Sequence, residues 1–118
     1  MIAVRSGEVY RADLEPVRGS EQGRTRPIIV LQNPSLARFT TTALCIPLTS
    51  NTGRLGLPGT CFIMKGEGGL TQDSVALGFQ LRALDTARLT HRLGIVSHAT
   101  LEMVGDAVLN ALGIVIGP

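Results

Sequence analysis

The 118-residue chain has no tryptophan, two cysteines and two histidines. In a chain without an apolar leader, Cys45 and Cys61 indicate reduced, buried thiols rather than a secreted disulfide scaffold. His91 and His98 do not combine with these cysteines into the spacing of a zinc or haem site. The nucleotide-binding and hydrolase motifs G-x-G-x-x-G, P-loop and G-x-S-x-G are also absent. We therefore expect no metal and no cofactor.

Long hydrophobic runs are missing as well. No segment approaches the roughly 20 apolar residues that span a bilayer, and residues 1–5 lack a hydrophobic leader. The 14 glycines and 6 prolines follow no fixed period and accompany 44% hydrophobic residues, so neither disorder nor a fibrous repeat fits. The sequence predicts one folded domain over residues 1–118, located in the cytoplasm, with no membrane partner.

Aromatic residues make up only 3% of the chain. The four aromatic side chains are those of Tyr10, Phe39, Phe62 and Phe79. Most of them fall in apolar strand patterns, which predicts that they lie in the core. Proteins that bind single-stranded nucleic acid usually stack bases on aromatic side chains. This shortage therefore argues against an RNA-binding module without catalysis.

Lysine is nearly absent, because Lys65 is the one lysine among 11 basic residues. Arginine is preferred where a planar fork grips carboxylate or phosphate, although a genome rich in G and C produces the same bias. Residues 1–60 hold seven basic and four acidic residues, and residues 61–118 hold four and five. Residues 17–38 carry a local charge of +3, from Arg18, Arg24, Arg26, Arg38 and Glu21. Such a cluster suits a phosphodiester ligand, and the alternative is a solvated loop with incidental charge.

Apolar periodicity predicts six short strands followed by one helix. The strands are expected at 8–14, 27–32, 42–49, 60–64, 74–81 and 93–96, with one helical turn at 85–88. Pro47 implies a sheet edge or a bulge near the end of the third strand. The helix is indicated by apolar residues at Leu101, Val104, Val108 and Leu112, with Ser97 or Thr100 as N-cap and Gly113 as its stop. Strands first and a helix last suggest a small, strongly curved antiparallel barrel or sandwich with a helix on its side.

Two positions are placed to bind an anion. Arg26 directly precedes Pro27 at the start of a strand, where the restricted backbone aims its guanidinium more tightly than a free loop would. Thr49, Ser50 and Asn51 group hydroxyl and amide donors at the end of another strand. The alternative for Thr49 is a strand residue whose hydroxyl only caps a turn.

Several blocks of sequence together resemble the MazF/PemK (Kid)-like toxins of type II toxin–antitoxin systems, over nearly the whole chain. These blocks are Gly7-Glu8-Val9-Tyr10, Asp13-Leu14-x-Pro16, Gly19-Ser20-Glu21-Gln22-Gly23, Arg26-Pro27-Ile28-Ile29-Val30-Leu31, Pro47-Leu48-Thr49-Ser50, Gly69-Leu70, Asp73-Ser74-Val75, Gln80-Leu81-Arg82-Ala83-Leu84-Asp85, Arg88-Leu89 and Leu112-Gly113. The resemblance implies a mainly β fold with short helices, an SH3-like antiparallel barrel of the MazF/CcdB type with a C-terminal helix. It also implies a homodimer and a cognate antitoxin with an acidic, disordered tail.

The implied activity is that of a metal-independent, sequence-specific endoribonuclease. It would cut single-stranded RNA, messenger RNA and in some cases ribosomal or transfer RNA, and so arrest translation and growth. The resemblance assigns catalytic roles to Arg26 and Thr49, and Glu21 is a candidate general base that could instead restrain Arg24 or Arg26. The predicted RNA-binding residues are Ser20, Gln22, Arg24, Thr25, Ser50, Asn51, Gln80 and Arg82. An acid and an arginine that act together in some relatives are replaced here by Phe79 and Leu77, so that pair is not transferred.

Two alternatives remain at this point. The first is a toxin of the same barrel type that traps DNA gyrase, as CcdB does. That function depends in relatives on a C-terminal Trp-Gly-Ile, whereas Leu112-Gly113-Ile114 stands here. The second is the non-catalytic RNA-binding module. His91 has no catalytic match in the family and His98 begins the last helix, so we expect structural or surface roles for both histidines.

Overall fold

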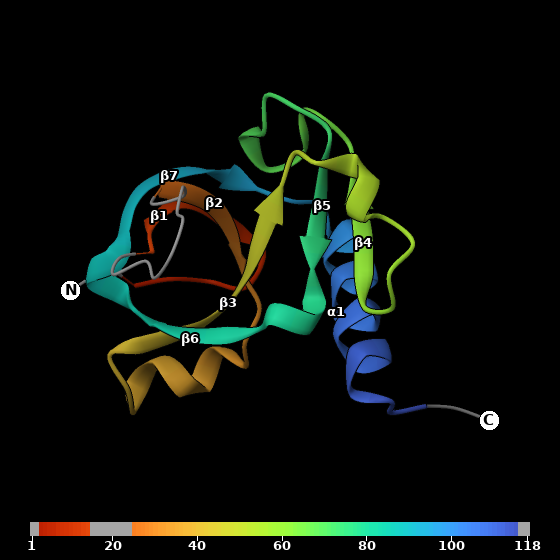
Figure 1. Ribbon diagram of the computed structural model, residues 1–118. Helices are drawn as coiled ribbons and strands as arrows, with labels where there is room; N and C mark the ends of the chain where they lie inside the picture. The colour runs from red at the N-terminus through yellow and green to blue at the C-terminus, as the bar shows by residue number, and fades with distance from the viewer. Residues whose placement is uncertain (1–2, 15–24, 116–118) are drawn as a thin grey trace.

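The computed structural model describes residues 3–14 and 25–115. Within them the chain forms antiparallel strands, short 3-10 turns and one C-terminal α-helix (Figure 1). The strands are β1 (Glu8–Asp13), β2 (Thr25–Val30), β3 (Thr42–Thr49), β4 (Thr60–Ile63), β5 (Ser74–Leu77), β6 (Arg82–Asp85) and β7 (Leu89–Ile95). The 3-10 turns are η1 (Pro34–Arg38), η2 (Thr52–Arg54), η3 (Glu67–Gly69), η4 (Gly78–Gln80) and η5 (Thr86–Arg88), and the helix is α1 (His98–Leu112).

The strands pair in the order β4-β5-β3-β2-β1-β7, and β6 pairs with β3 beside β5. In Figure 1 the strands β7, β1, β2, β3 and β6 curve around a common interior, while β4 and β5 lie next to α1. This confirms the predicted class, a mainly β fold of small antiparallel-barrel type with a C-terminal helix. Among the described residues the pairing follows an open path rather than a closed ring.

β3 is central, so of the two expectations for Pro47, an edge or a bulge, the sheet edge is wrong. The first half of β3, through Cys45, pairs with β6, and from Leu48 onward β3 pairs with β5. Pro47 falls between these two partners while its other side pairs with Ile28 of β2. The lack of an N–H at Pro47 therefore costs no ladder hydrogen bond on the side where the partners change.

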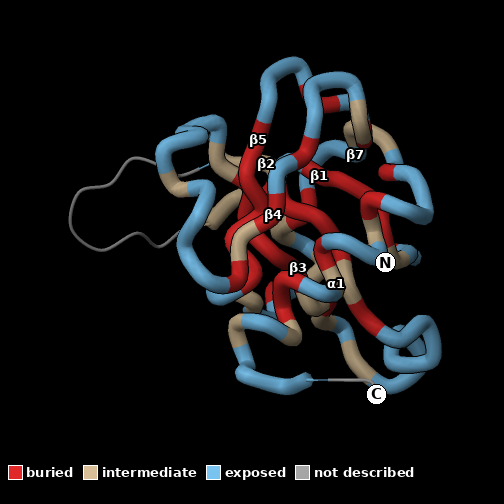
Figure 2. Tube along the Cα trace, turned by 90° about the vertical axis from the view of Figure 1, so that its right-hand side faces the viewer, coloured by how far each residue is buried: buried red, intermediate tan, exposed pale blue. Residues whose placement is uncertain are grey.

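The curved sheet buries apolar side chains on both of its faces. One cluster, around Val9, Ile29 and Ile46, lies between the sheet and α1. The other, around Tyr10, Ile28 and Cys45, fills the curl of the sheet. Figure 2 shows buried residues concentrated in the paired strands and exposed residues in the connections. Both cysteines are free and buried, as expected.

The predicted boundaries of α1 are confirmed. The Ser97 hydroxyl accepts the Thr100 N–H at 3.2 Å, and Gly113 ends the helix at φ 74°, a left-handed conformation that suits glycine. Val104 and Val108 are buried, whereas Leu112 is exposed, so the apolar stripe of α1 ends before the last turn. No helix in the described part of the chain is long and apolar enough to cross a membrane.

Three features of the strand prediction were wrong. The expected 74–81 strand ends at Leu77, because the chain turns into η4 at Gly78. β6 was missed, since only one of its four residues is buried and its sequence therefore shows no apolar period. The last strand begins at Leu89 rather than 93, with mostly exposed residues in its first half. These changes give seven strands in the described residues instead of six.

The placement of the aromatic residues was also wrong. Tyr10 is buried, but Phe39, Phe62 and Phe79 are 79%, 37% and 42% exposed. Phe62 alternates with the buried Cys61 and Ile63 and so points outward from β4. Phe79 belongs to η4 rather than to a strand. Exposed aromatic rings are therefore present, and the shortage of them no longer argues against base stacking.

Candidate active site

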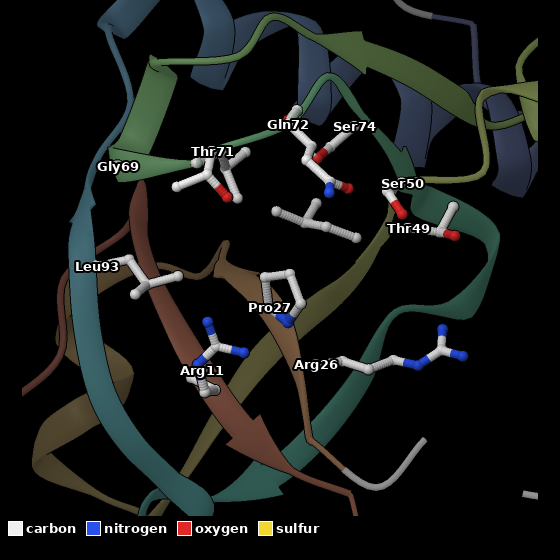
Figure 3. A pocket seen from close by; sticks show the side chains of 12 residues that line it. Arg11, Arg26, Pro27, Thr49, Ser50, Gly69, Thr71, Gln72, Ser74 and Leu93 are labelled. Carbon is white, nitrogen blue, oxygen red and sulfur yellow. The ribbon is translucent and has the colours of Figure 1, made fainter. Parts of the chain in front are cut away.

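A pocket of about 420 Å³ opens where β1, β2 and β3 meet the segment between η3 and β5 (Figure 3). It is lined by Arg11, Arg26, Pro27, Leu48, Thr49, Ser50, Gly69, Leu70, Thr71, Gln72, Ser74 and Leu93. Three residues predicted from the sequence, Arg26, Thr49 and Ser50, are brought together here. Arg26 lies 23 positions before Thr49 in the chain, and the pairing of β2 with β3 joins the two segments.

The strand register places the two predicted catalytic residues side by side. Ile29 pairs with Ile46 and Ile28 with Pro47, and continuing this register by two residues sets Arg26 opposite Thr49. Arg26 is held in β2 by its pairing with Ala12 of β1. In Figure 3 the Arg26 side chain extends toward the Thr49 end of the pocket. A phosphate at this end would meet a guanidinium and a hydroxyl together.

The Thr49 hydroxyl is oriented by the turn that follows β3. Its oxygen accepts the Asn51 N–H at 3.1 Å, so one lone pair is occupied and the hydroxyl proton remains to be donated. The Asn51 side-chain oxygen in turn accepts the Gly53 N–H at 3.1 Å and caps η2. Thr49 therefore does cap a turn, as the alternative supposed, and it lines the pocket as well.

Arg11 is a pocket residue that the sequence reasoning did not select. It lies in β1 between the buried Tyr10 and Ala12, so its side chain leaves the opposite face of the strand. Its pairing partner is Pro27, and Figure 3 shows Arg11 and Arg26 on either side of that proline. The predicted alternation of Tyr10 and Ala12 already contained the signal, since it leaves Arg11 on the other face.

The pocket wall opposite the arginines is the segment that begins at Gly69 and carries the polar side chains of Thr71, Gln72 and Ser74. A side chain at Gly69 would overlap the Leu93 carbonyl, and Gly69 has φ +77°, so only glycine fits this contact with β7. The buried Ser74 hydroxyl donates to the Gln72 carbonyl at 3.0 Å and fixes that turn. In Figure 3 the Gln72 amide points into the pocket. Sequence reasoning missed Gln72, which precedes the Asp73-Ser74-Val75 block.

The remaining predicted residues lie elsewhere. Thr25, Asn51, Gln80 and Arg82 are exposed and do not line this pocket. Arg82 pairs with Cys45 across β6 and β3. Ser20, Glu21, Gln22 and Arg24 lie outside the described residues.

The charge of the pocket is of one sign. Among the described residues that line it, Arg11 and Arg26 are charged, and both are cations. The other polar groups include hydroxyls, a side-chain amide and backbone N–H groups, all of which can donate to oxygen. The geometry therefore suits a phosphate-containing ligand.

A family model described as "PemK-like, MazF-like toxin of type II toxin-antitoxin system" matches residues 5–112. The chain belongs to this family. A curated relative, "Endoribonuclease MazF" from Staphylococcus saprophyticus, is 36% identical over 111 residues, which cover 94% of this chain and 92% of the relative. This MazF-like toxin is thus a homologue of an endoribonuclease, and the resemblance inferred from the sequence is confirmed.

Solved structures show the same fold. An "Endoribonuclease from Mycobacterial species" matches with a TM-score of 0.79 and 24% identity, covering 99% of the MazF-like chain and 98% of that chain. A mycobacterial "Endoribonuclease in complex with its cognate antitoxin" matches with a TM-score of 0.77 and 23% identity, covering 99% of the MazF-like chain and 100% of that chain. MazF from Deinococcus radiodurans matches with a TM-score of 0.76 and 24% identity, covering 97% of the MazF-like chain and 100% of that chain.

The histidines and thiols of the MazF-like chain lie apart from the pocket. His91 and His98 are exposed, and His98 Nε2 lies 3.3 Å from Glu102 one helical turn away. Burial raises the pKa of Cys45 to about 12, although the charge of Arg82 acts in the opposite direction. Burial also raises the pKa of Cys61. In the described residues no three His, Cys, Asp or Glu side chains group as metal ligands.

A buried acid lies on the same strand as Arg11 but outside the pocket. The Glu8 carboxylate accepts hydrogen bonds from Arg92 Nε at 2.8 Å, from the Arg5 N–H at 2.6 Å and from the Tyr10 hydroxyl at 3.2 Å. Burial acts to raise the Glu8 pKa, but these hydrogen bonds outweigh it, so the pKa lies below its ordinary value. Burial and the Glu8 carboxylate raise the pKa of Tyr10. This network joins β1 to β7 and has a structural role.

Proposed function

We propose that this MazF-like toxin is an endoribonuclease that cuts single-stranded RNA at the Arg26–Thr49 pocket without a metal ion. The observation that carries the proposal is that Arg26 and Thr49 line one pocket, in which the charged residues among the described lining are arginines. The 36% identical relative named as an endoribonuclease supports the same activity. Cleavage of RNA would stop translation and growth.

RNA supplies the nucleophile in the proposed reaction. The 2′-oxygen bonds to the neighbouring phosphorus as its proton leaves, and the bond from phosphorus to the 5′-oxygen breaks as that oxygen gains a proton. The products are a 2′,3′-cyclic phosphate, or the 3′-phosphate after hydrolysis, and a 5′-hydroxyl. Arg26 stabilises the negative charge that develops on phosphorus oxygens, because fixed donors aimed at developing charge are often the largest catalytic contribution. Thr49 donates its hydroxyl to a phosphate oxygen.

The proposed reaction also needs one group that takes the proton from the 2′-hydroxyl and one that gives a proton to the leaving 5′-oxygen. Arg26 is the candidate to share in protonating the 5′-oxygen, although an arginine side chain holds its protons tightly and makes a poor proton shuttle. Glu21, which lies outside the described residues, is the candidate base on its charge and its place near Arg26 in the sequence. Restraint of Arg24 or Arg26 by the same carboxylate is the alternative role.

The RNA strand is proposed to follow the pocket and its rim. Arg11 and Gln72 join Ser50 as binding residues on the pocket wall. The predicted contacts outside the pocket are Ser20, Gln22, Arg24, Thr25, Asn51, Gln80 and Arg82. Discrimination among RNA sequences would come from base contacts along this path, since phosphate contacts alone carry no sequence information.

Two protein partners are proposed. A mycobacterial relative of this fold was solved with its cognate antitoxin, and a MazE-MazF complex from Deinococcus radiodurans is a second example. A cognate antitoxin with an acidic, disordered tail would complement the arginines of the pocket. A second copy of the chain is the other partner, and exposed apolar side chains beside α1, including Leu57 and Met103, support a homodimer. The cytoplasmic location stays a prediction.

Incubation of the purified protein with a long single-stranded RNA tests the proposed activity. We expect new 5′-hydroxyl ends at a limited set of sites, at the same rate with and without a chelator, and no cuts in DNA of the same sequence. Binding of RNA without new ends would instead support the non-catalytic module, which the exposed phenylalanines allow. Loss of the cuts on chelation would show that a metal takes part.

A further inference from the structure

An exposed aromatic ring and an arginine form a cation–π contact outside the pocket, on the 3-10 turns η2 and η4 that follow β3 and β5. The guanidinium carbon of Arg54 lies over the Phe79 ring, 5.8 Å from its centroid. Phe79 is 42% exposed, although a ring of this size is usually covered in a small domain. Neither residue lines the pocket, and neither takes part in the proposed cleavage.

Arg54 is tied to Thr49 through one turn of backbone. The Arg54 N–H donates to the Asn51 carbonyl at 3.1 Å, while the Asn51 N–H donates to the Thr49 hydroxyl at 3.1 Å. Asn51 also caps η2, in which Arg54 is the last residue. The position of Arg54 is therefore set by the same turn that orients Thr49.

The position of Phe79 is set by the backbone of η4. The Gly78 N–H donates to the Gly59 carbonyl at 2.7 Å. A Cβ at Gly78 would lie 2.7 Å from that oxygen and 3.2 Å from the backbone of α1, so this position admits only glycine. Since Gly78 is pressed against α1, the next side chain, Phe79, is directed outward from a fixed backbone.

We propose that Arg54 and Phe79 form a stacking site for one base of the RNA next to the phosphate that is cut. Bases stack on aromatic rings and on guanidinium planes, and the arginine adds a charge for the neighbouring phosphate. Arg54 is connected to Thr49 through Asn51, and Phe79 directly precedes Gln80 within η4. The proposal rests on the proposed function, because it assumes that the ligand of the pocket is RNA.

The substitution Phe79→Leu removes the aromatic face but keeps an apolar side chain, and Phe79→Trp enlarges the face. Binding is measured with a single-stranded RNA whose 2′-hydroxyl at the cut site is replaced by hydrogen, so that binding is independent of cleavage. We expect Kd to rise about tenfold in Phe79→Leu and to be restored in Phe79→Trp. Arg54→Ala should raise Kd as well. The matched control is Phe39→Leu, since Phe39 is 79% exposed on η1 and should leave Kd unchanged.

An abasic RNA identifies the stacked position. Removing the base beside the cut phosphate should weaken binding to the unsubstituted protein about as much as Phe79→Leu does, and should cost nothing further in Phe79→Leu. With cleavable RNA, kcat should stay within about twofold while KM rises. Equal Kd for Phe79→Leu and the unsubstituted protein, or additive losses with every abasic RNA, overturn the stacking site.

The failure of the stacking site is distinguishable from failure of the proposed function. RNA that binds through Phe79 but is never cut contradicts the proposed cleavage and leaves the stacking site standing. RNA that is cut at an unchanged KM by Phe79→Leu contradicts the stacking site alone. Weaker binding of poly-glutamate by Phe79→Leu, with unchanged RNA binding, would assign the pair to an acidic protein partner and also overturn the proposal.

Discussion

Two of the hollows formed by the described residues differ in character. The pocket at the ends of β2 and β3 is about 420 Å³, and its charged residues are Arg11 and Arg26. The second, about 590 Å³, is a groove between residues 55–61 and α1; it contains Leu57 and Met103, and Asp106 is its charged residue. One hollow is suited to an anion and the other to an apolar protein surface, so a single small domain can present nucleic-acid and protein contacts on separate elements.

The largest expected effect is a loss of cleavage when a pocket residue is changed, which a change in an arginine elsewhere on the surface should not cause. Arg26→Ala and Thr49→Ala should each lower the kcat for RNA cleavage about 100- to 1,000-fold, because each removes a donor aimed at the developing charge. Thr49→Ser keeps the hydroxyl and should retain most of the activity. Rates are measured with a labelled single-stranded RNA at saturation.

Arg38→Ala is the matched control for these pocket variants. Arg38 is an exposed arginine on η1 that does not line the pocket. Its removal should leave kcat within about twofold. A loss in Arg38→Ala equal to that in Arg26→Ala would mean that general positive charge, and not the pocket, carries the activity.

A charge introduced into the groove beside α1 should change the oligomeric state of the protein. Met103→Glu places a charge on a half-exposed apolar position, which a folded monomer tolerates and a buried interface does not. We expect the mass in sedimentation to fall from that of a dimer to that of a monomer at micromolar concentration. Phe39→Glu, outside the groove, should leave the dimer intact. A dimer that survives Met103→Glu would place the interface elsewhere.

Arg11 should give a smaller effect of a different kind. If it holds a phosphate without taking part in the chemistry, Arg11→Ala should weaken binding of all RNA sequences about equally and reduce the slope of log K against log salt by about 1. kcat should change little. Binding measured at several salt concentrations checks this prediction. An unchanged slope with a large loss of kcat would move Arg11 from binding to catalysis.

The smallest effect concerns folding rather than either hollow. Glu8→Gln should lower the free energy of unfolding by about 1–3 kcal/mol at pH 7, because it weakens buried hydrogen bonds from Arg92 and Arg5. The folded-state pKa of Glu8 lies below its ordinary value of 4.5. Its stabilisation is therefore complete above the unfolded pKa and is lost as pH falls through the lower folded pKa. Denaturant unfolding between pH 7 and pH 3 measures the difference.

Glu102→Gln is the control for Glu8→Gln. Glu102 is exposed on α1 beside His98, and surface pairs of this kind contribute little. Its removal should leave the free energy of unfolding nearly unchanged at pH 7. Equal losses in both variants would contradict the structural role assigned to the Glu8 network.

The sequence revealed those parts of the site that lie at recognisable strand ends. Arg26 before a proline and Thr49-Ser50 after an apolar strand could be selected locally, and the register of β2 and β3 then brings them together. The alternation of Tyr10 and Ala12 places Arg11 on the other face of β1, but the sequence does not show that this face meets the pocket. The exposure of Phe79 likewise depends on the turn at Gly78, which is fixed by contact with α1 and leaves no periodic signal.

The measurement that tests the central claim most directly is cleavage of an RNA from which a single 2′-hydroxyl has been removed. The proposed chemistry at the Arg26–Thr49 pocket uses that hydroxyl as the nucleophile. We predict that replacing it with hydrogen at a mapped cut site abolishes cleavage at that bond, while the other sites are cut as before to leave 5′-hydroxyl ends. Continued cleavage at the substituted site, or 5′-phosphate ends, would contradict the account.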